Sequence, residues 1–372
     1  MPILRTLLAC LSVAQLSLCA LTPVNYGAFT QTATYSLANQ LDVFTANGLN
    51  VTYLQIPNST YGYAQLLSGG YDILTGTADN AVSLRFNQNK TVTILGELDG
   101  GPDLAIASVP GITEVTQLRG KALMVDSATS GYAYVLRKVL GLYGLKLEDG
   151  DYTFQVSSRV GSLTGRCAKL IVPAIQVVGS TNIRYQYLTA GSLPNGTAVY
   201  ATILTYPFTA EAEAQTPPLN ILARVSDFVN PFASSAFTVS QDSLTNSTKK
   251  DVYTRFLASF LQANKLLADP TKSKCAIAAI AKHLNVTTAV AKAEYAAATA
   301  KDTGETVTNG TFAVNRQGLL NVIDVRGQFG GFAAAPADFN YAEAIVPGTG
   351  MLIDDGVRLA AAAVKSSFKP KC

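Results

Sequence analysis

Gly-Lys-Ala-Leu-Met-Val-Asp-Ser-Ala-Thr-Ser-Gly, at residues 120–131, combines the signals of a strand, a loop and a helix start. The apolar residues 122–125 predict a short buried strand, and the small polar residues 126–130 predict a loop after it. Apolar residues then recur at helical spacing over residues 132–143. This order places backbone N–H groups where an acidic or polar small molecule can be held. We interpret the stretch as one wall of a ligand cleft.

Strands alternate with helices before this stretch. Four strands are expected, at residues 24–27, 49–56, 71–75 and 91–95. The first is followed by a helix through Leu41 and Phe44 that ends at Asn47-Gly48. Such alternation predicts an α/β fold with a parallel sheet that helices cover.

The chain after Ser240 predicts helices. They are expected at residues 249–267, 275–284, 287–300 and 317–326. In the first of them Val252, Phe256, Phe260 and Leu267 form an apolar stripe. We interpret these helices as packing elements.

Composition and charge fit a globular protein of two domains. The chain has 372 residues, of which 48% are hydrophobic and 14% charged, so two hydrophobic cores can form. Its net charge is only +3, and no block of Lys and Arg stands out. We therefore expect no nucleic-acid partner, because such a partner needs a concentrated positive surface.

The N-terminus predicts a signal peptide over residues 1–20. Arg5 supplies a positive charge, residues 7–18 are apolar, and small residues end the run. The run is too short to span a bilayer, and no other stretch is predicted to be transmembrane. A lipoprotein site at Cys19 is the alternative, but the residues before Cys19 fit it poorly.

Seven Asn-x-Ser/Thr sequons indicate a glycosylated secreted protein of a eukaryote. Chance occurrence in a Thr-rich chain is the alternative for some of them. The sequons begin at Asn50, Asn58, Asn89, Asn195, Asn246, Asn285 and Asn309.

The cysteines predict one disulfide. Cys10 and Cys19 are expected to leave with the signal peptide, so Cys167, Cys275 and Cys372 remain. We expect Cys275 to pair with Cys372, because the last residue of a secreted chain is usually tethered.

An ordered series of short motifs resembles the SsuA/THI5-like family of type II periplasmic substrate-binding proteins, whose ligands are nitrate, sulfonates, taurine and pyrimidines. The series covers about residues 24–240, and this chain resembles a secreted, fungal-type member. Its motifs are Gly27, Ala46-Asn-Gly-Leu-Asn-Val51, Leu67-Ser-Gly-Gly-Tyr-Asp72, Leu118-Arg-Gly-Lys121, the loop at 125–131, Val178-Gly-Ser-Thr181, Arg184, Leu188 and Ala201-Thr-Ile-Leu-Thr-Tyr-Pro207.

The resemblance implies two α/β lobes, each with a mostly parallel sheet, and a ligand cleft between them. Lobe I comprises residues 22–100 and the C-terminal part, and lobe II comprises 101–205. Crossovers are expected near 97–107 and 205–232, so that residues 206–372 contain the return crossover and the helical part of lobe I.

Ligand-binding residues are expected in the loops that follow the carboxyl ends of the strands. Almost all are uncharged hydrogen-bonding residues, for which helix capping is the alternative role. The aromatic residues are expected to stack on a flat ring or to pack in the core, and Arg184 to bind an anionic group or to be a solvated helix charge. The expected residues are Phe29, Thr30, Gln31, Ser59, Thr60, Gly76, Thr77, Ser127, Thr129, Ser130, Gly131, Ser180, Thr181, Arg184 and Tyr206.

The segment Val156 to Gln176 interrupts the family pattern. Without these 21 residues, Phe154-Gln155 would run directly into Val177-Val178-Gly179-Ser180-Thr181. The length and the codons that its ends permit fit a short fungal intron that was translated by mistake. Its removal would also leave two mature cysteines. A genuine surface insertion is the alternative, because folds tolerate insertions well.

Catalytic and metal-binding motifs are missing from the sequence. The only histidine, His283, is expected at the boundary of a helix, and one histidine makes neither a usual zinc set nor a local catalytic triad. Asp354-Asp355 is interpreted as a helix N-cap. The Cys-Cys-Cys-Phe-Cys motif, histidine and cofactor-binding lysine of the related pyrimidine synthases of thiamine biosynthesis are also missing.

These observations predict a secreted, extracellular, monomeric protein that binds a small molecule, has no cofactor and is not an enzyme. Its ligand is expected to be small and polar, anionic or heterocyclic, of the sulfonate, nitrate or pyrimidine type. The sequence does not identify a transporter or receptor partner. The alternatives are a pyrimidine-synthase-like enzyme of the same fold and a surface glycoprotein that has lost its ligand.

Overall fold

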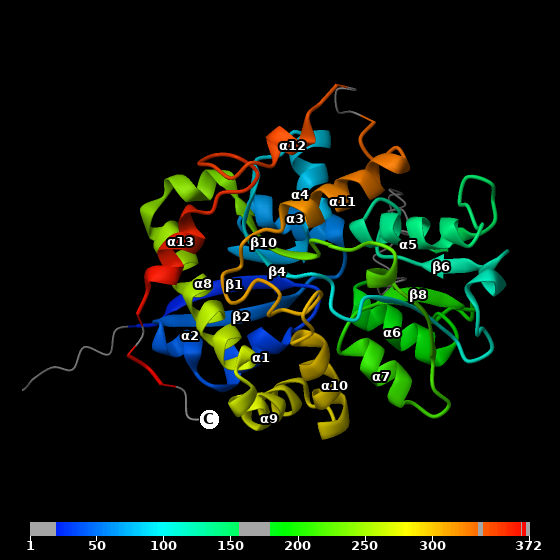
Figure 1. Cartoon of the computed structure of the whole chain (residues 1–372), viewed down its shortest axis with the longest axis horizontal. Coiled ribbons are helices and arrows are strands. Elements are labelled where there is room, and N and C mark those ends of the chain that lie inside the picture. Colours follow the sequence, from blue (N-terminus) through cyan, green and yellow to red (C-terminus); the bar gives the residue numbers. More distant parts are fainter. Residues whose placement is uncertain (1–19, 156–178, 334–337, 366, 370–372) are drawn as a thin grey trace, which may run out of the picture.

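The computed structural model describes residues 20–155, 179–333, 338–365 and 367–369. Residues 1–19 of the expected signal peptide, the segment Val156 to Gln176 and Cys372 lie outside these residues. The described chain forms two lobes, each built on a five-stranded sheet that helices cover (Figure 1). The predicted fold class is therefore confirmed.

The first sheet consists of β1 (Thr22–Ala28), β2 (Leu49–Gln55), β3 (Ile73–Thr77), β4 (Val92–Asp99) and β10 (Ser235–Ser240). Its strand order is β2-β1-β3-β10-β4. β1 is parallel to β2 and β3, whereas β10 is antiparallel to both β3 and β4. The first four strands lie within a few residues of their predicted positions, whereas β10 was not predicted.

The second sheet repeats this arrangement. It consists of β5 (Ala105–Ser108), β6 (Ala122–Met124), β7 (Thr153–Gln155), β8 (Ala201–Leu204) and β9 (Asn220–Arg224). Its strand order is β7-β6-β8-β5-β9, in which β6 is parallel to β7 and β8 and β5 is antiparallel to β8 and β9.

Two crossings connect the sheets. Residues 100–104 lead from β4 to β5, and residues 225–234 lead from β9 to β10. Each crossing thus ends in the antiparallel strand of the sheet that it enters. Because β9 pairs with β5, the chain leaves the second sheet only after Arg224, later than the expected limit at residue 205.

Helices cover both faces of the first sheet (Figure 1). On one side lie α1 (Ala33–Gln40), α2 (Val43–Ala46), α8 (Ser247–Ala268), α9 (Ser273–Leu284), α10 (Thr288–Ala298) and α13 (Gly356–Ala363). On the other lie α3 (Ser59–Ser68), α4 (Ala78–Val82), α11 (Arg316–Gln328) and α12 (Tyr341–Ala344). In the second lobe, α5 (Gly131–Leu142) lies on one side of the sheet and α6 (Thr181–Ala190) and α7 (Phe208–Ala214) on the other.

Aromatic side chains fill the core between the first sheet and α8. The ring of Tyr26, on β1, lies 5.4 Å from that of Tyr35 on α1, 5.1 Å from that of Phe256 and 5.8 Å from that of Phe260, centroid to centroid. Both phenylalanines belong to the apolar stripe predicted for α8. Each such pair adds about 0.5–1.5 kcal/mol beyond the burial of its area, so this cluster fixes α1 and α8 on the sheet.

One helix differs from its prediction. The helix expected through Leu41 and Phe44 is divided into α1 and α2, because Asp42 has a left-handed backbone with φ of 55°. Aspartate adopts this conformation more readily than most residues, and the apolar periodicity continues across the break. Periodicity alone therefore could not reveal it.

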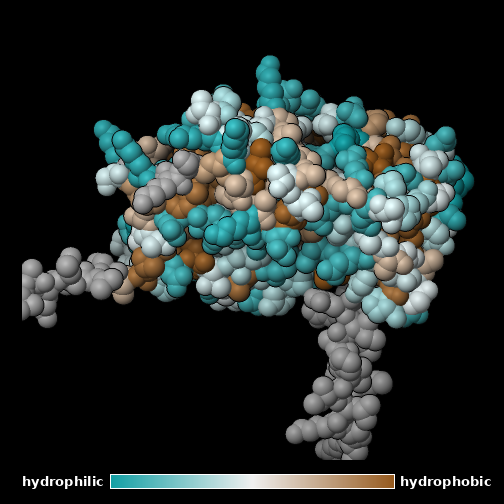
Figure 2. Space-filling view, turned by 90° about the horizontal axis from the view of Figure 1, so that it is seen from below, coloured by the Kyte–Doolittle hydropathy of each residue, from teal (hydrophilic) through white to brown (hydrophobic). Residues whose placement is uncertain are grey.

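The four helices expected after Ser240 are present as α8, α9, α10 and α11. Over the described ranges, none of the helices has the length and apolarity needed to cross a bilayer. The face seen in Figure 2 is largely hydrophilic, with apolar residues in small groups between the polar ones.

Candidate functional site

The stretch at residues 120–131 forms β6, a loop and the start of α5, as predicted. Ser130 is the N-cap of α5, and its hydroxyl accepts a hydrogen bond from the Ala133 N–H at 3.4 Å. The loop carries Asp126 and Ser130 to the boundary between the lobes, where both line a cavity. This local structure is what makes the stretch one wall of a candidate binding site.

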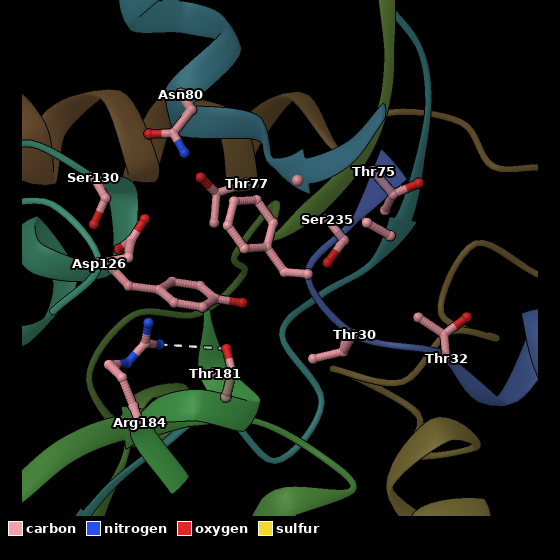
Figure 3. A pocket seen from close by; sticks show the side chains of 14 residues that line it. Thr30, Thr32, Thr75, Thr77, Asn80, Asp126, Ser130, Thr181, Arg184 and Ser235 are labelled. Carbon is pink, nitrogen blue, oxygen red and sulfur yellow. Dashed lines mark hydrogen bonds between the residues drawn. The ribbon is translucent and has the colours of Figure 1, made fainter. Parts of the chain in front are cut away.

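This inner cavity is lined by residues of both lobes (Figure 3). The centres of water-sized spheres can occupy about 30 Å³ of it, which is room for roughly two or three water molecules. Its lining residues are Ala28, Phe29, Thr30, Thr32, Thr75, Gly76, Thr77, Asn80, Asp126, Ser130, Tyr132, Thr181, Arg184 and Ser235.

Arg184, on α6, supplies the positive charge of the inner cavity. Its side chain is buried, with 1% of the residue exposed. The guanidinium donates hydrogen bonds to the Gly179 carbonyl at 2.7 Å and to the Thr202 hydroxyl at 3.0 Å. It also donates to the Thr181 hydroxyl and the Ile203 carbonyl, each at 3.3 Å. All four acceptors are uncharged, so they fix the guanidinium without neutralising it.

No carboxylate of the described residues forms an ion pair with Arg184. Burial accordingly lowers the pKa of Arg184, an effect that Asp126 and Tyr132 partly offset. The N-terminus of α6 adds to the positive potential, because the N-cap residue Ser180 makes no side-chain hydrogen bond to the helix. The lower wall of the cavity in Figure 3, formed by Arg184 and Thr181, therefore favours an anion or a polarised acceptor.

Two reciprocal hydrogen bonds join the lobes beside the inner cavity. Asp126 of the second lobe accepts from the N–H of Ser59, the first residue of α3, at 3.1 Å. Asn80 of the first lobe accepts from the N–H of Gly131, the first residue of α5, at 3.2 Å. Each lobe thus places a side-chain oxygen on the positive end of a helix of the other lobe.

Tyr132 and Thr77 complete the polar lining. Burial is the main cause that raises the pKa of Tyr132 far above its usual value, so the phenol keeps its proton. The hydroxyl oxygen of Thr77 is buried and has no hydrogen-bond partner among the described residues. Since an unpaired buried hydroxyl costs free energy, a bound ligand that pairs with Thr77 gains stability.

Arg326 makes a third contact between the lobes. Arg326 of α11 forms a two-pronged ion pair with Asp79 of α4, at 2.7 and 2.6 Å. The same guanidinium donates to the Thr129 carbonyl at 2.9 Å and lies 4.3 Å from the centre of the Tyr134 ring. The ion pair lies within the first lobe, whereas Thr129 and Tyr134 belong to the second lobe, so Arg326 also contacts the other lobe.

The structure brings about half of the expected site residues into the inner cavity: Phe29, Thr30, Gly76, Thr77, Ser130, Thr181 and Arg184. A neighbouring cavity contains Ser59, Thr60, Ser127 and Thr129. The remaining four residues, Gln31, Gly131, Ser180 and Tyr206, line neither of these cavities.

The hydroxyl of Tyr206 points to another partner. It donates to the Glu305 carboxylate at 2.6 Å, and the same carboxylate accepts from the N–H groups of Ala33 and Thr34 at 2.8 Å each. Glu305 thus occupies the N-terminus of α1. Tyr206 holds this carboxylate, and stacking on a ligand in the inner cavity is not open to it.

Several lining residues were missing from the sequence prediction. Thr32 and Asn80 adjoin predicted loops, so wider loop limits would have included them. Thr75 and Asp126 lie in loops that were expected to face the cleft, and Tyr132 begins the helix after the second of them, although none of the three was named as a ligand-binding residue. Ser235 lies at the start of β10, which gave no strand signal linking it to the cleft.

His283 is half-buried on α9, as the sequence predicted. Its ring meets Tyr35 edge-on at 5.3 Å, and its Nδ1 lies 3.3 Å from the Gln40 amide nitrogen. Burial lowers its pKa. The part of the chain that the structure describes contains no cluster of His, Cys, Asp and Glu suited to a metal ion.

No family model matches the chain, and no curated protein matches it by sequence. Its structure resembles those of several binding proteins. It matches the periplasmic nitrate-binding protein NrtA of Synechocystis PCC 6803 with a TM-score of 0.66 at 12% identity, over 93% of this chain and 89% of that one.

Two further matches support the same architecture. A Candida albicans gene product, described as defining a new family with the generic periplasmic binding protein fold, matches with a TM-score of 0.58 at 17% identity, over 87% of this chain and 92% of that one. The alkanesulfonate-binding protein SsuA of Xanthomonas axonopodis pv. citri, bound to MOPS, matches with a TM-score of 0.54 at 17% identity, over 74% and 84%. The chain therefore has the two-lobed fold of the periplasmic binding proteins.

Proposed function

We propose that this chain is a secreted, non-catalytic solute-binding protein that closes its lobes on a small polar, anionic or heterocyclic ligand. The observation that carries the proposal is the position of Arg184, a buried cation in a cavity between the lobes that forms no ion pair with any carboxylate of the described residues. A buried charge is costly unless it is paired. An anionic ligand in the inner cavity would supply the partner.

The uncharged residues that line the inner cavity can form hydrogen bonds with both donors and acceptors of a ligand. Threonine and serine hydroxyls surround the cavity, with Asn80 and the phenol of Tyr132. Such groups both donate and accept hydrogen bonds, and Asp126 supplies a pure acceptor. A ligand with an anionic or acceptor end towards Arg184 and a donor towards Asp126 would satisfy both. A heterocycle with adjacent donors and acceptors fits this description as well as a small anion does.

The similar structures are consistent with this proposal. One of them binds nitrate, and another binds alkanesulfonates and contains MOPS. Both ligands carry negative charge on oxygen atoms, which is the chemistry that a guanidinium recognises.

The lobe limits are proposed from sheet membership. Lobe I comprises residues 22–99 and 235–363, and lobe II comprises 105–224, with the crossings between them. A hinge at the two crossings would let the lobes part to admit a ligand and close to bury it. We propose that the protein acts as a monomer and delivers its ligand to a membrane transporter or receptor.

Secretion, glycosylation and the disulfide belong to the same proposal. Six of the seven sequon asparagines are exposed, and Asn58 is partly exposed, with its side-chain oxygen capping α3. Cys275 is disulfide-bonded. We propose Cys372 as its partner, which non-reducing peptide mapping of the mature protein would test.

Titration calorimetry with nitrate, sulfate, methanesulfonate and a set of pyrimidines tests the proposed function. We expect at least one of them to bind, and Arg184→Gln to weaken this binding by about 2–5 kcal/mol, because a buried charge contact is lost. Arg184→Lys keeps the charge but not the planar donors, so its affinity should lie between those of the wild type and Arg184→Gln.

Arg119→Gln is the matched control. Arg119 is an exposed arginine of the same lobe that lines neither cavity, so its loss should leave binding unchanged. Circular dichroism verifies that each variant is folded. Equal affinities of the wild type and of a folded Arg184→Gln variant would contradict the proposed site. Absence of binding by every compound of the panel would contradict the proposed function.

A further inference from the structure

A second cavity, the outer chamber, adjoins the inner cavity. It lies between α3, the α4 region and the loop before α5, and Asn80 lines both spaces. Its lining residues are Ser59, Thr60, Tyr63, Ala64, Leu67, Asn80, Ser83, Leu84, Gln88, Lys90, Ser127 and Thr129. Like the inner cavity, it is therefore lined by both lobes.

The two spaces differ greatly in size. The centres of water-sized spheres can occupy about 250 Å³ in the outer chamber and about 30 Å³ in the inner cavity. The inner cavity holds a group of a few heavy atoms. Any larger ligand whose charged end contacts Arg184 must continue into other space, and the outer chamber is the adjoining cavity that shares a wall with it.

The boundary between the spaces is polar. The Ser59 N–H donates to Asp126 at 3.1 Å and so connects a residue of the outer chamber with one of the inner cavity. Asn80, which lines both spaces, accepts from the N–H of Gly131 at 3.2 Å. Parting of the lobes would break these inter-lobe bonds and so open a passage between the two spaces. A molecule with a compact head and a longer tail fits this division.

The chemistry of the outer chamber specifies the tail. Five of its lining residues are serines and threonines, while Tyr63, Leu67 and Leu84 add apolar surface. Tyr63 and Leu84 are buried, whereas Thr60, Gln88 and Lys90 at the rim are exposed. Its lining contains no carboxylate and one cation. Hydroxyl-rich walls with apolar patches are suited to a hydroxylated carbon chain or ring.

We propose that the ligand is an organic anion with a compact acidic head at Arg184 and a hydroxylated tail in the outer chamber. This inference rests on the proposed function. The outer chamber then sets specificity: short anions fill only the inner cavity, whereas hydroxylated organic acids such as sugar sulfonates fill both spaces and bind more tightly.

Three probes with the same head test this: methanesulfonate, hexane-1-sulfonate and sulfoquinovose, a six-carbon sugar sulfonate. Calorimetry on the wild-type protein should give sulfoquinovose an affinity at least about tenfold above that of methanesulfonate, with hexane-1-sulfonate between them. Equal affinities for all three would overturn the inference. Tighter binding of hexane-1-sulfonate than of sulfoquinovose would contradict the proposal that the tail of the ligand is hydroxylated.

Ala64→Trp tests the location of the tail. Ala64 is an exposed residue of α3 that lines the outer chamber, so a tryptophan there fills the chamber without disturbing the core. We expect the variant to bind methanesulfonate like the wild type and to lose the tenfold gain for sulfoquinovose. Ser68→Trp, exposed on the same helix but outside both spaces, should keep that gain.

The outcomes separate the two proposals. If nitrate or a pyrimidine binds but no sulfonate does, this inference fails and the proposed function stands. If no compound of either panel binds, both fail. A sulfoquinovose gain that survives Ala64→Trp would also overturn the inference, because the tail would then lie elsewhere.

Discussion

Glu294 is a single residue with a large electrostatic effect. It lies on α10, is fully buried, and neither of its carboxylate oxygens has a hydrogen-bond partner among the described residues. Burial, and after it the nearby Glu305 and Glu211 carboxyls, raise the pKa of Glu294 well above its usual value. The side chain is therefore protonated in the folded state under conditions in which the unfolded chain has released the proton.

The free energy of unfolding should consequently fall as the pH rises. Below the unfolded pKa of about 4.3 both states hold the proton, and above it only the folded state does, at a cost of up to about 1.4 kcal/mol per pH unit. Glu294→Gln removes this contribution, so urea unfolding from pH 5 to 8 should give the variant a flatter profile. Parallel profiles of wild type and variant would contradict the assigned protonation.

Arg184 shows what the sequence could and could not reveal at this scale. Its place near the loop at 179–181 was predictable from the motif order. Its burial was not, because the residues that enclose and bind it, such as Thr202 and Ile203, come from a strand that the helix pattern does not indicate. A buried arginine and a solvated one look alike in one sequence.

The first residue of α5, Gly131, packs closely against the first lobe. A Cβ atom on Gly131 would lie 2.9 Å from a carboxylate oxygen of Asp79 and 2.9 Å from the hydroxyl oxygen of Thr77. Asp79 is already paired with Arg326, and Thr77 lines the inner cavity. The start of α5 therefore requires glycine for close packing.

Gly131→Ala should destabilise the protein by about 1–3 kcal/mol, because overpacking displaces Asp79 and Thr77. Gly141→Ala, in the same helix, is the matched control. Its Cβ would meet no atom within 4 Å, and alanine favours a helix interior by up to about 1 kcal/mol. Urea unfolding should thus show a lower free energy of unfolding for Gly131→Ala and a higher one for Gly141→Ala. Destabilisation of equal size in both variants would contradict the close approach at Gly131.

Element types were predictable wherever local signals agreed. The first four strands and the helices after Ser240 follow apolar periodicity and glycine stops. β10 was not predicted, because its insertion between β3 and β4 depends on pairing with strands distant in sequence. The return crossover was expected near 205–232, and the chain crosses at 225–234. The limit of lobe II at residue 205 was too early, because the pairing of β9 with β5 is a long-range contact that no local pattern indicates.

At the scale of the whole molecule, contacts within the chain hold the lobes together. They include the Asp126 to Ser59 bond, the Asn80 to Gly131 bond and the Arg326 contacts with Thr129 and Tyr134. The hydrogen bond from Tyr206 to Glu305 joins the lobes as well. The contacts of Asp126, Asn80 and Arg326 involve α3, α4, α5, α11 and the loops beside them, whereas Glu305 lies at the N-terminus of α1. Closure therefore does not depend on a ligand alone, and a ligand must compete with these contacts to enter.

The double variant Asn80→Ala, Asp126→Ala should shift the free protein towards an open form. Removing both acceptors leaves the first N–H groups of α3 and α5 without their partners in the other lobe, so the closed form loses stability. Small-angle X-ray scattering should show a larger radius of gyration than for the wild type. Asp149→Ala, an exposed change on the second lobe, serves as control. Identical scattering from the double variant and the wild type would contradict a role of these two hydrogen bonds in holding the lobes closed.

The location of β10 in the chain also affects how the protein folds while it is being synthesised. All five strands of the second sheet leave the ribosome before β10 does, so the second lobe can fold while the first sheet still lacks its fourth position. During that interval β3 and β4 each expose an edge that β10 will later cover, and open edges invite pairing with other chains. Nascent chains that stall between β9 and β10 are therefore the ones most in need of a chaperone.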